Sequence, residues 1–298
     1  MLLTYFTFKF KFPKKFFILI ALLFATNAFC QQTVVYPRPE SEDDVRSSYP
    51  VMLLQQCERK NPRLISLKPS NVSTQQGRSL RQVANNSGID IAWVLTTKQR
   101  EEALLPIRIP IDRGLIGWRL LLIKNTKDDV FNTITNNDQL ANLLAGQGHD
   151  WPDVDILKAN DFKVSSSSTY QGLFHMLARE RIDYFPRAIS EVWPEYEANS
   201  HLDLKVHSKL VMYYPSAFYF FVNKNNHFLA KLIEDCLIES IQDGSFKTLF
   251  DGYFSDSIKR SNLQNRTILR LTNPLLPAAT PINKSEYWFS PEEYISEG

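Results

Sequence analysis

The chain has 298 residues, of which 34 are basic, 32 acidic, five histidine and three cysteine. A nearly neutral chain gives no electrostatic reason to expect nucleic acid or an anionic membrane as a partner. The histidines and cysteines lack the short spacings of metal ligands, so we expect no metal site and no cofactor. Any binding therefore has to come from a local pocket.

The first thirty residues have the composition of a secretory signal peptide. Four lysines between positions 9 and 15 precede an apolar run over 16–24, and small residues follow up to Cys30. The run is shorter than the roughly 20 residues that span a bilayer, although an uncleaved anchor is the alternative. Phe29 stands where a lipoprotein would carry a small residue. We therefore predict a signal peptide over 1–30 and a periplasmic, monomeric protein. Its remaining 30 basic residues (34 less the four in the leader) and 32 acidic residues leave a charge of about −2.

The chain after the leader alternates strand and helix patterns, which is typical of layered α/β folds. Its first part predicts strands over 33–36, 63–67 and 89–95. Pro50 marks the start of one helix between them, and Gly88 marks the end of a second. Cys57 and Cys236 lie on apolar faces of predicted helices. A disulfide between them and two buried thiols are both compatible with that placement.

The middle of the chain predicts a long apolar strand over 115–123. Asn137 or Asp138 should cap a helix that ends at Gly146, and a further helix carries an apolar stripe over 170–177. Pro186 is expected to stop a strand over 182–185. The remaining strands are expected over 154–157, 162–164, 202–206 and 217–222.

The C-terminal part contains the clearest helix pattern, over 228–242, where an apolar residue recurs every four positions. Asp243 and Gly244 end it, and Ser245 is expected to cap a short helix. Residues 266–298 contain four prolines and little periodicity, so we expect a tail on the surface.

Four short segments stand out by their order along the chain. They are TTKQR at 96–100, GQGHDW at 146–151, RIDYFPR at 181–187, and DGSF at 243–246 followed by Tyr253 and Phe254. Together they resemble the extracellular solute-binding proteins of family 3, the polar-amino-acid type of the two-lobed periplasmic binding fold. The resemblance implies an α/β fold in which two lobes, joined by a hinge with two chain crossings, close on a small ligand.

The resemblance also divides the chain into lobes. Lobe one would be discontinuous and made of 31–112 and 219–266, and lobe two would be the insert over 113–218. The hinge crossings would lie near 111–114 and near 215–218, and a C-terminal tail would cover 267–298. A glycine or proline in each crossing is compatible with a hinge.

The first candidate for ligand binding is Arg100, the last residue of the TTKQR segment. The resemblance implies that this arginine clamps a ligand carboxylate, and the planar fork of a guanidinium suits that role. Loops at strand ends of α/β sheets are also where ligands bind. The alternative is a surface arginine paired with Glu101 or Glu102.

The second candidate is the GQGHDW turn, which the family uses to present backbone N–H groups at a helix N-terminus, a place that attracts anions. The candidate ligand-binding side chains here are Gln147, His149 and Trp151. Trp151 either stacks on a ligand or plugs the core ahead of Pro152.

The third candidate lies in RIDYFPR, which resembles a segment where an aspartate five positions after the first binds the ligand's ammonium group. In this chain that position holds Ala188, flanked by Arg187 and Glu191. Either Glu191 replaces the missing carboxylate or Arg187 makes the pocket anion-selective. The departure argues against an ordinary α-amino acid as the ligand. Asp183 itself is expected to be structural.

Tyr36 and Arg38 are the fourth candidates, because the family places an aromatic residue and a proline at the mouth of the cleft. The alternative is an ordinary loop stiffened by the prolines at 37 and 39. Trp93 and Trp118 lie on apolar strands and are expected in the core.

No hydrolase elbow, phosphate-binding loop or zinc-protease motif is present, so we predict a binding protein and no enzyme. The predicted function is capture of a small polar ligand, bearing a carboxylate or an amine, by hinge closure for an ABC-type importer. One alternative is a ligand sensor that acts on a membrane receptor. The other is an orphan hydrolase or lyase that uses His149, Asp150 or Glu191 in the same cleft.

Overall fold

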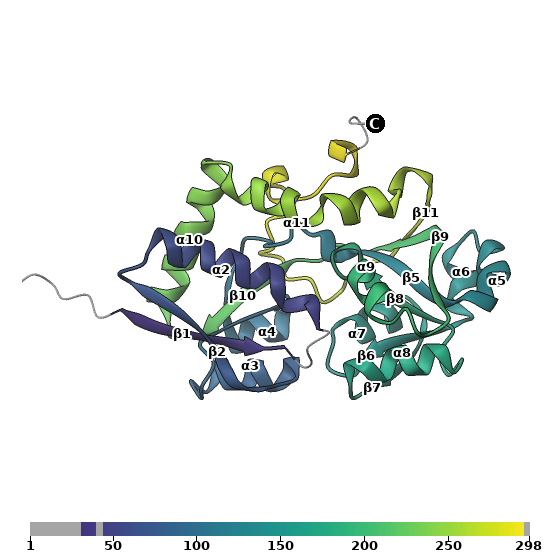
Figure 1. The fold of residues 1–298 in the computed structure, drawn as a ribbon, viewed down its shortest axis with the longest axis horizontal. Helices are drawn as coiled ribbons and strands as arrows, with labels where there is room; N and C mark the ends of the chain where they lie inside the picture. The colour runs from purple at the N-terminus through teal and green to yellow at the C-terminus, as the bar shows by residue number, and fades with distance from the viewer. Residues whose placement is uncertain (1–30, 40–43, 295–298) are drawn as a thin grey trace, which may run out of the picture.

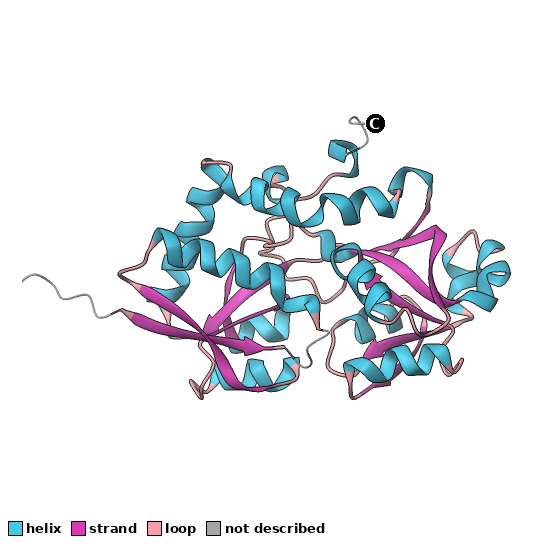
Figure 2. Cartoon of the chain, in the orientation of Figure 1, coloured by secondary structure: helices cyan, strands magenta, loops and turns pink. Residues whose placement is uncertain are grey.

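The computed structural model describes residues 31–39 and 44–294, and the predicted signal peptide lies outside them. Figures 1 and 2 show two lobes, each built on β-strands covered by helices. The predicted two-lobed α/β fold is confirmed. Across the described ranges, we find no helix that is both long enough and apolar enough to cross a bilayer.

Lobe one contains two small sheets. In one, β1 (Gln32–Arg38) pairs in parallel with β2 (Ile65–Ser73). In the other, β10 (Phe218–Asn223) lies antiparallel between β3 (Ile91–Leu95) and β4 (Leu104–Ile107). Because β10 comes from a distant part of the chain, this lobe is discontinuous. Its helices are α2 (Ser48–Lys60), α3 (Gln76–Ala84), α4 (Lys98–Ala103) and α10 (His227–Gln242).

A disulfide joins the two pieces of lobe one. It links Cys57 on α2 to Cys236 on α10, which are 179 positions apart in the chain. The sequence left open whether these cysteines pair, and the fold brings their Cα atoms to 5.6 Å. Disulfides persist in oxidising compartments, so this bond agrees with a place outside the cytoplasm.

Lobe two is built on one sheet of six strands in the order β11-β9-β5-β8-β6-β7. The strands are β5 (Trp118–Lys124), β6 (Leu144–Gly148), β7 (Lys163–Ser167), β8 (Tyr184–Ala188), β9 (Leu204–Tyr213) and β11 (Thr267–Arg270). The helices are α5 (Asp128–Asn132), α6 (Asn137–Ala141), α7 (Asp153–Lys158), α8 (Tyr170–Ala178) and α9 (Ile189–Ala198). Central β5 lies between β8 and β9 and is buried from Trp118 to Ile123, which explains its long apolar run.

The chain crosses between the lobes twice at the hinge, as predicted. The first crossing, 108–117, runs from β4 to β5, and the second, 214–217, runs from β9 to β10. The Asp112 carboxylate accepts hydrogen bonds from the N–H groups of Gly114 at 3.0 Å and Ile116 at 2.7 Å. Gly114 has a φ of +74°, a left-handed conformation that favours glycine. The first crossing is therefore a turn whose conformation is set by the Asp112 carboxylate and by Gly114.

A long helix adds a further connection between the lobes. α11 (Ser245–Ser261) runs along both of them in Figure 1. Near its end the Trp193 indole N–H of α9 donates to the Ser257 carbonyl at 2.9 Å, and Arg260 pairs with Glu197 at 2.7 Å. The chain then forms β11 and returns to the hinge.

The segment after 266 is more ordered than a surface tail. The prediction is wrong for Thr267–Arg270, which pair in parallel with β9 as strand β11, a pairing that no local periodicity signals. Further on, Glu293 pairs with Arg113 in the first crossing at 2.9 Å. The ring of Trp288 packs on Gly114, where a Cβ atom would lie 2.4 Å from it. The hinge is therefore covered by this segment.

Several local predictions are wrong. Residues 154–157 belong to helix α7, whose first turn carries Asp153 and Asp155, a pattern that favours helices. The helix expected to end at Gly146 ends at Ala141, so Leu143 lies in the connection that follows and Leu144 is the first residue of β6. β8 continues through Pro186, because its pairing with β6 is confined to Tyr184 and a strand bonded along one edge tolerates proline.

The expected helix cap at 245 is also wrong. Ser245 is the first residue of α11, and its N–H donates to the Asp243 carboxylate at 2.9 Å. The helix that follows has 17 residues and is therefore long, whereas a short one was expected.

Candidate ligand-binding cleft

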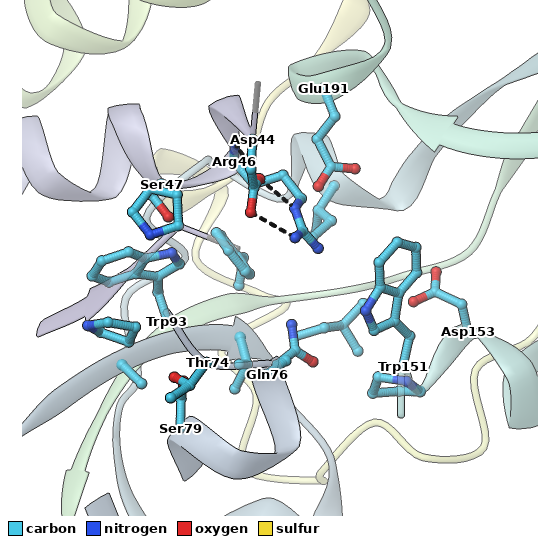
Figure 3. Close-up of a pocket in the computed structure, with 18 of the residues that line it drawn as sticks. Asp44, Arg46, Ser47, Thr74, Gln76, Ser79, Trp93, Trp151, Asp153 and Glu191 are labelled. Carbon is cyan, nitrogen blue, oxygen red and sulfur yellow. Dashed lines mark hydrogen bonds and ion pairs between the residues drawn. The ribbon is translucent and has the colours of Figure 1, made fainter. Parts of the chain in front are cut away.

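A cavity lies between the two lobes, and residues of both lobes line it (Figure 3). Its volume is about 90 Å³, which is room for several water molecules or a small organic group. The side chains that matter here are Arg38, Asp44, Arg46, Gln76 and Trp93 of lobe one, and Arg119, Trp151, Asp153, Arg187 and Glu191 of lobe two.

Two indole rings stand on opposite sides of this cavity (Figure 3). Trp93 of β3 packs against Tyr36, with ring centroids 6.1 Å apart. Trp151 follows β6 and stacks on Phe185, with centroids 6.3 Å apart and planes at 19°. A Cβ atom on Gly148 would lie 2.5 Å from the Trp151 ring, so the glycine lets this ring fold back over the strand end.

The two tryptophans therefore combine packing with access to the cavity. Trp93 is 92% buried, as expected of a core residue, yet it lines the cleft. Trp151 packs on Phe185 and also faces the cleft, while its stacking on a ligand stays a prediction. Trp118, by contrast, is a core residue that packs on Tyr213 with centroids 4.5 Å apart.

Lobe two places a buried ion network under the cavity. Arg187 at the end of β8 donates from Nε and Nη2 to the two carboxylate oxygens of Glu195, both at 2.6 Å. Its Nη2 also lies 2.9 Å from Glu191 Oε2. Burial alone lowers the pKa of Arg187, but the carboxylates of Glu191 and Glu195 outweigh it and raise that pKa well above its usual value. The guanidinium is therefore charged.

A second arginine completes the network. Arg119 Nη2 lies 2.7 Å from Asp153 Oδ1, and its Nη1 lies 3.7 Å from Glu191 Oε2. The hydroxyl of Tyr214 donates to the same Asp153 carboxylate. Burial lowers the pKa of Arg119, but Asp153, Tyr214 and Glu191 together outweigh it, so the pKa is raised. Two guanidinium groups thus face three carboxylates within this network. Over the whole cavity lining, four arginines (38, 46, 119 and 187) stand against three carboxylates (44, 153 and 191).

Four of the eight predicted site residues line the cavity. They are Arg38, Trp151, Arg187 and Glu191. Arg38 also donates from Nε to the Ser70 carbonyl at 2.9 Å. Glu191 lies in the first turn of α9 and accepts the Ala188 N–H at 3.4 Å. The position that holds Ala188 therefore has a carboxylate next to it.

Arg100 does not line the cavity, although it lies between the lobes. Its Nη1 donates to the Leu95 carbonyl at 2.7 Å, and its Nη2 donates to Gln76 Oε1 at 2.7 Å and to the Asp150 carbonyl at 3.2 Å. Burial lowers its pKa to about 10, so it stays charged at neutral pH. The alternative pairing with Glu101 is not formed, because Glu101 pairs with Arg108. In this structure Arg100 connects lobe one to the turn after β6.

The other three predicted residues also lie away from the lining. Gln147 is buried within β6, where no described residue hydrogen-bonds its amide group. His149 is exposed, and its N–H donates to the Ser167 carbonyl at 3.0 Å. Tyr36 packs against the ring of Trp93.

The GQGHDW turn contacts lobe one through a carboxylate. Asp150 Oδ2 accepts the N–H of Gly77 at 2.7 Å, at the start of α3. The helix that follows the turn, α7, has only six residues and carries Asp153 in its first turn. The anion-binding role expected of this turn therefore receives no support, because carboxylates of the protein already lie there.

Asp44, Arg46 and Gln76 of lobe one line the cleft and were not found from the sequence. The ion network of lobe two contains three more such residues: Arg119, Asp153 and Glu195. Arg119 carries a signal, since it is the one charge inside the apolar run of β5. The other two lie on short helices with further acidic residues nearby and look like solvated positions. Within the described part of the chain, no group of three or more His, Cys, Asp and Glu side chains is placed to hold a metal ion.

No protein-family model matches this sequence, and neither does any curated protein. Solved structures match its fold. An ancestral arginine-binding protein bound to arginine matches with a TM-score of 0.57 and 15% identity, covering 76% of this chain and 100% of that chain. A probable amino-acid ABC transporter extracellular-binding protein from Bacillus subtilis matches with a TM-score of 0.57 and 18% identity, covering 76% and 99%.

A putative L-cystine ABC transporter from Listeria monocytogenes matches with a TM-score of 0.53 and 18% identity, covering 75% of this chain and 96% of that chain. All three structures are similar over nearly their whole length. The predicted likeness to the two-lobed amino-acid-binding fold is therefore confirmed at the level of the fold.

Proposed function

We propose that this protein captures a small polar ligand in the cleft between its lobes and presents it to an ABC-type importer. The observation that carries the proposal is the cavity, to which each lobe contributes an indole ring and charged side chains. Only the closed form makes both sets of contacts, so a ligand would favour closure. The fold and the disulfide support a binding protein that works outside the cytoplasm, in the periplasm.

The chemistry of lobe two supports an amine-bearing ligand. Glu191 is the carboxylate of the network with the most solvent contact, at 15% exposure of its side chain, against 6% for Asp153 and none for Glu195. It is therefore the carboxylate that a ligand reaches first. We propose that Glu191 takes the role of the absent aspartate and accepts a hydrogen bond from the ligand's ammonium group.

Lobe one offers two candidates for a ligand carboxylate. Arg38 lines the cavity directly. Arg100 would have to exchange its hydrogen bond to the Asp150 carbonyl for one to the ligand. The clamp role of Arg100 stays a prediction, and Trp93 and Trp151 are proposed to stack on the ligand between the lobes.

The test is thermal unfolding of the protein against a panel of amino acids, amines, small carboxylates and short peptides. A ligand should raise the melting temperature as its concentration rises, by mass action. Glu191→Gln keeps the size of the side chain and removes its charge, so it should weaken an amine-bearing ligand by about tenfold or more.

Glu197→Gln is the matched control, because Glu197 lies on the same helix and is exposed. Glu197→Gln should bind the panel ligand as tightly as the unaltered protein does. If no compound in the panel raises the melting temperature, the proposal fails. If an amine-bearing ligand binds as well to Glu191→Gln as to the parent, the assignment of Glu191 fails.

A further inference from the structure

The side chain of Arg46 crosses the cleft. It belongs to a short helix, η1 (Val45–Ser47), which directly precedes α2 in lobe one. Its guanidinium carbon lies 4.3 Å from the ring centroid of Tyr170 and 5.5 Å from that of Trp151. Both rings belong to lobe two. A guanidinium over aromatic faces is held by cation–π attraction.

A carboxylate of the same segment completes the recognition of this guanidinium. Arg46 Nε lies 2.6 Å from Asp44 Oδ1, and Arg46 Nη2 lies 2.7 Å from Asp44 Oδ2 (Figure 3). This two-point pair matches the planar fork of the guanidinium. The Asp44 side chain is only 4% exposed, so the pair lies in a largely dry part of the cleft.

The rings are held in place by contacts other than those with Arg46. The hydroxyl of Tyr170 donates to Glu195 at 2.9 Å, and its ring packs edge-on against Phe174 with centroids 5.2 Å apart. Trp151 is fixed by its stacking on Phe185 and by Gly148 beneath it. The surfaces that contact the guanidinium are therefore preformed and would remain if Arg46 were shortened.

We infer that Asp44, Tyr170 and Trp151 form a guanidinium-binding site, and that Arg46 is its built-in occupant. Arg46 belongs to lobe one and the rings to lobe two, so this contact holds the lobes together without a ligand. It also denies the site to any ligand that carries a guanidinium group. This last statement, on ligand selectivity, rests on the proposed function, whereas the site itself does not.

The experiment removes the occupant and offers its head group in solution. Arg46→Ala is unfolded thermally in the presence of methylguanidinium chloride and, separately, of methylammonium chloride. Methylguanidinium should raise the melting temperature in proportion to the logarithm of its concentration. Methylammonium should bind about tenfold more weakly or worse, because it lacks the planar fork and is more strongly hydrated. The unaltered protein should show no rise, since its site is filled.

Arg38→Ala is the matched control. Arg38 lines the same cavity, but its guanidinium donates to a backbone carbonyl and is not paired with Asp44. This variant reports the general effect of the salts on unfolding, and methylguanidinium should not raise its melting temperature. Equal responses of Arg46→Ala and Arg38→Ala to methylguanidinium would overturn the inference.

Arg46→Met keeps the apolar stem of the side chain and vacates only the position of its head, so it should respond as Arg46→Ala does. If either variant shows no folding transition by itself, methylguanidinium should restore one, and failure to restore it counts against the inference.

The two proposals fail separately. If a panel compound binds the unaltered protein but methylguanidinium does not stabilise Arg46→Ala, only the proposed function stands. The reverse result leaves only the guanidinium site standing.

Discussion

The two lobes share a layered plan but are held together by different means. Lobe one is assembled from two distant pieces of the chain, and the bond between Cys57 and Cys236 ties those pieces covalently. Lobe two comes mainly from one continuous stretch and places its buried charges, including the pair of Arg187 and Glu195, beside the cleft. Buried ion pairs seldom add stability over apolar packing. The difference indicates that the crosslink serves the fold, whereas the charges serve the cleft.

The largest expected effect comes from breaking the ion network of lobe two. Glu195→Ala leaves the buried Arg187 without its two-point partner, which should lower the free energy of unfolding by about 3 kcal/mol or more. Urea unfolding of the variant and the parent measures this difference. Glu197→Ala on the same helix removes only an exposed partner of Arg260, so its cost should stay below about 1 kcal/mol.

A double substitution sharpens the same point. Arg187→Met combined with Glu195→Leu replaces the pair by apolar side chains and should recover most of the stability lost in Glu195→Ala. A double variant as unstable as the single one would show that the pair itself stabilises lobe two, against the comparison drawn above.

The next largest effect should come from the crosslink of lobe one. Replacing both Cys57 and Cys236 by alanine frees a loop of 179 positions in the unfolded chain. This should lower the free energy of unfolding by about 2 to 4 kcal/mol. A reducing agent should destabilise the parent by a similar amount and leave the double variant unchanged. A parent protein insensitive to the reducing agent would contradict the structural role of this bond.

The smallest expected effect concerns a buried histidine of lobe two. Burial lowers the pKa of His207 on β9 to about 4 from its ordinary 6.5. At a pH between these two pKa values, His207 is neutral in the folded protein and protonated in the unfolded chain. Unfolding then takes up a proton, so the stability due to His207 should fall as the pH drops from about 6.5 to about 4.

His207→Phe should remove this dependence. Neither ring nitrogen has a hydrogen-bond partner among the described residues, so phenylalanine gives up no hydrogen bond, and it can pack on Phe131 as the imidazole does. The measurement is the difference in melting temperature between variant and parent as a function of pH, because other titrating groups cancel in that difference. A difference that stays constant over this range would contradict the prediction.

Much of the fold could be predicted from the sequence because its signals are local. The helix over 228–242 was recognised by its periodicity and lies where expected. The strand that contains Trp118 was recognised by its apolar run, although residues 115–117 at its expected start form a 3-10 helix. Strand β11 was missed because its stability comes from pairing with β9 and its own sequence carries no pattern. Residues 154–157 were misassigned because a short apolar run fits a strand and a helix equally well.

The sequence by itself determined the α/β class, the two lobes and the segments that approach the cleft. Only the tertiary structure decided which of their side chains reach the cavity. Trp151 faces it while Gln147, four positions earlier, is buried in a strand. Local patterns record which face of an element is apolar, but the group that a charged side chain meets belongs to another part of the chain. The pairing of Arg119 with Asp153, and the reach of Arg46 to Tyr170, exist only because the fold brings these segments together.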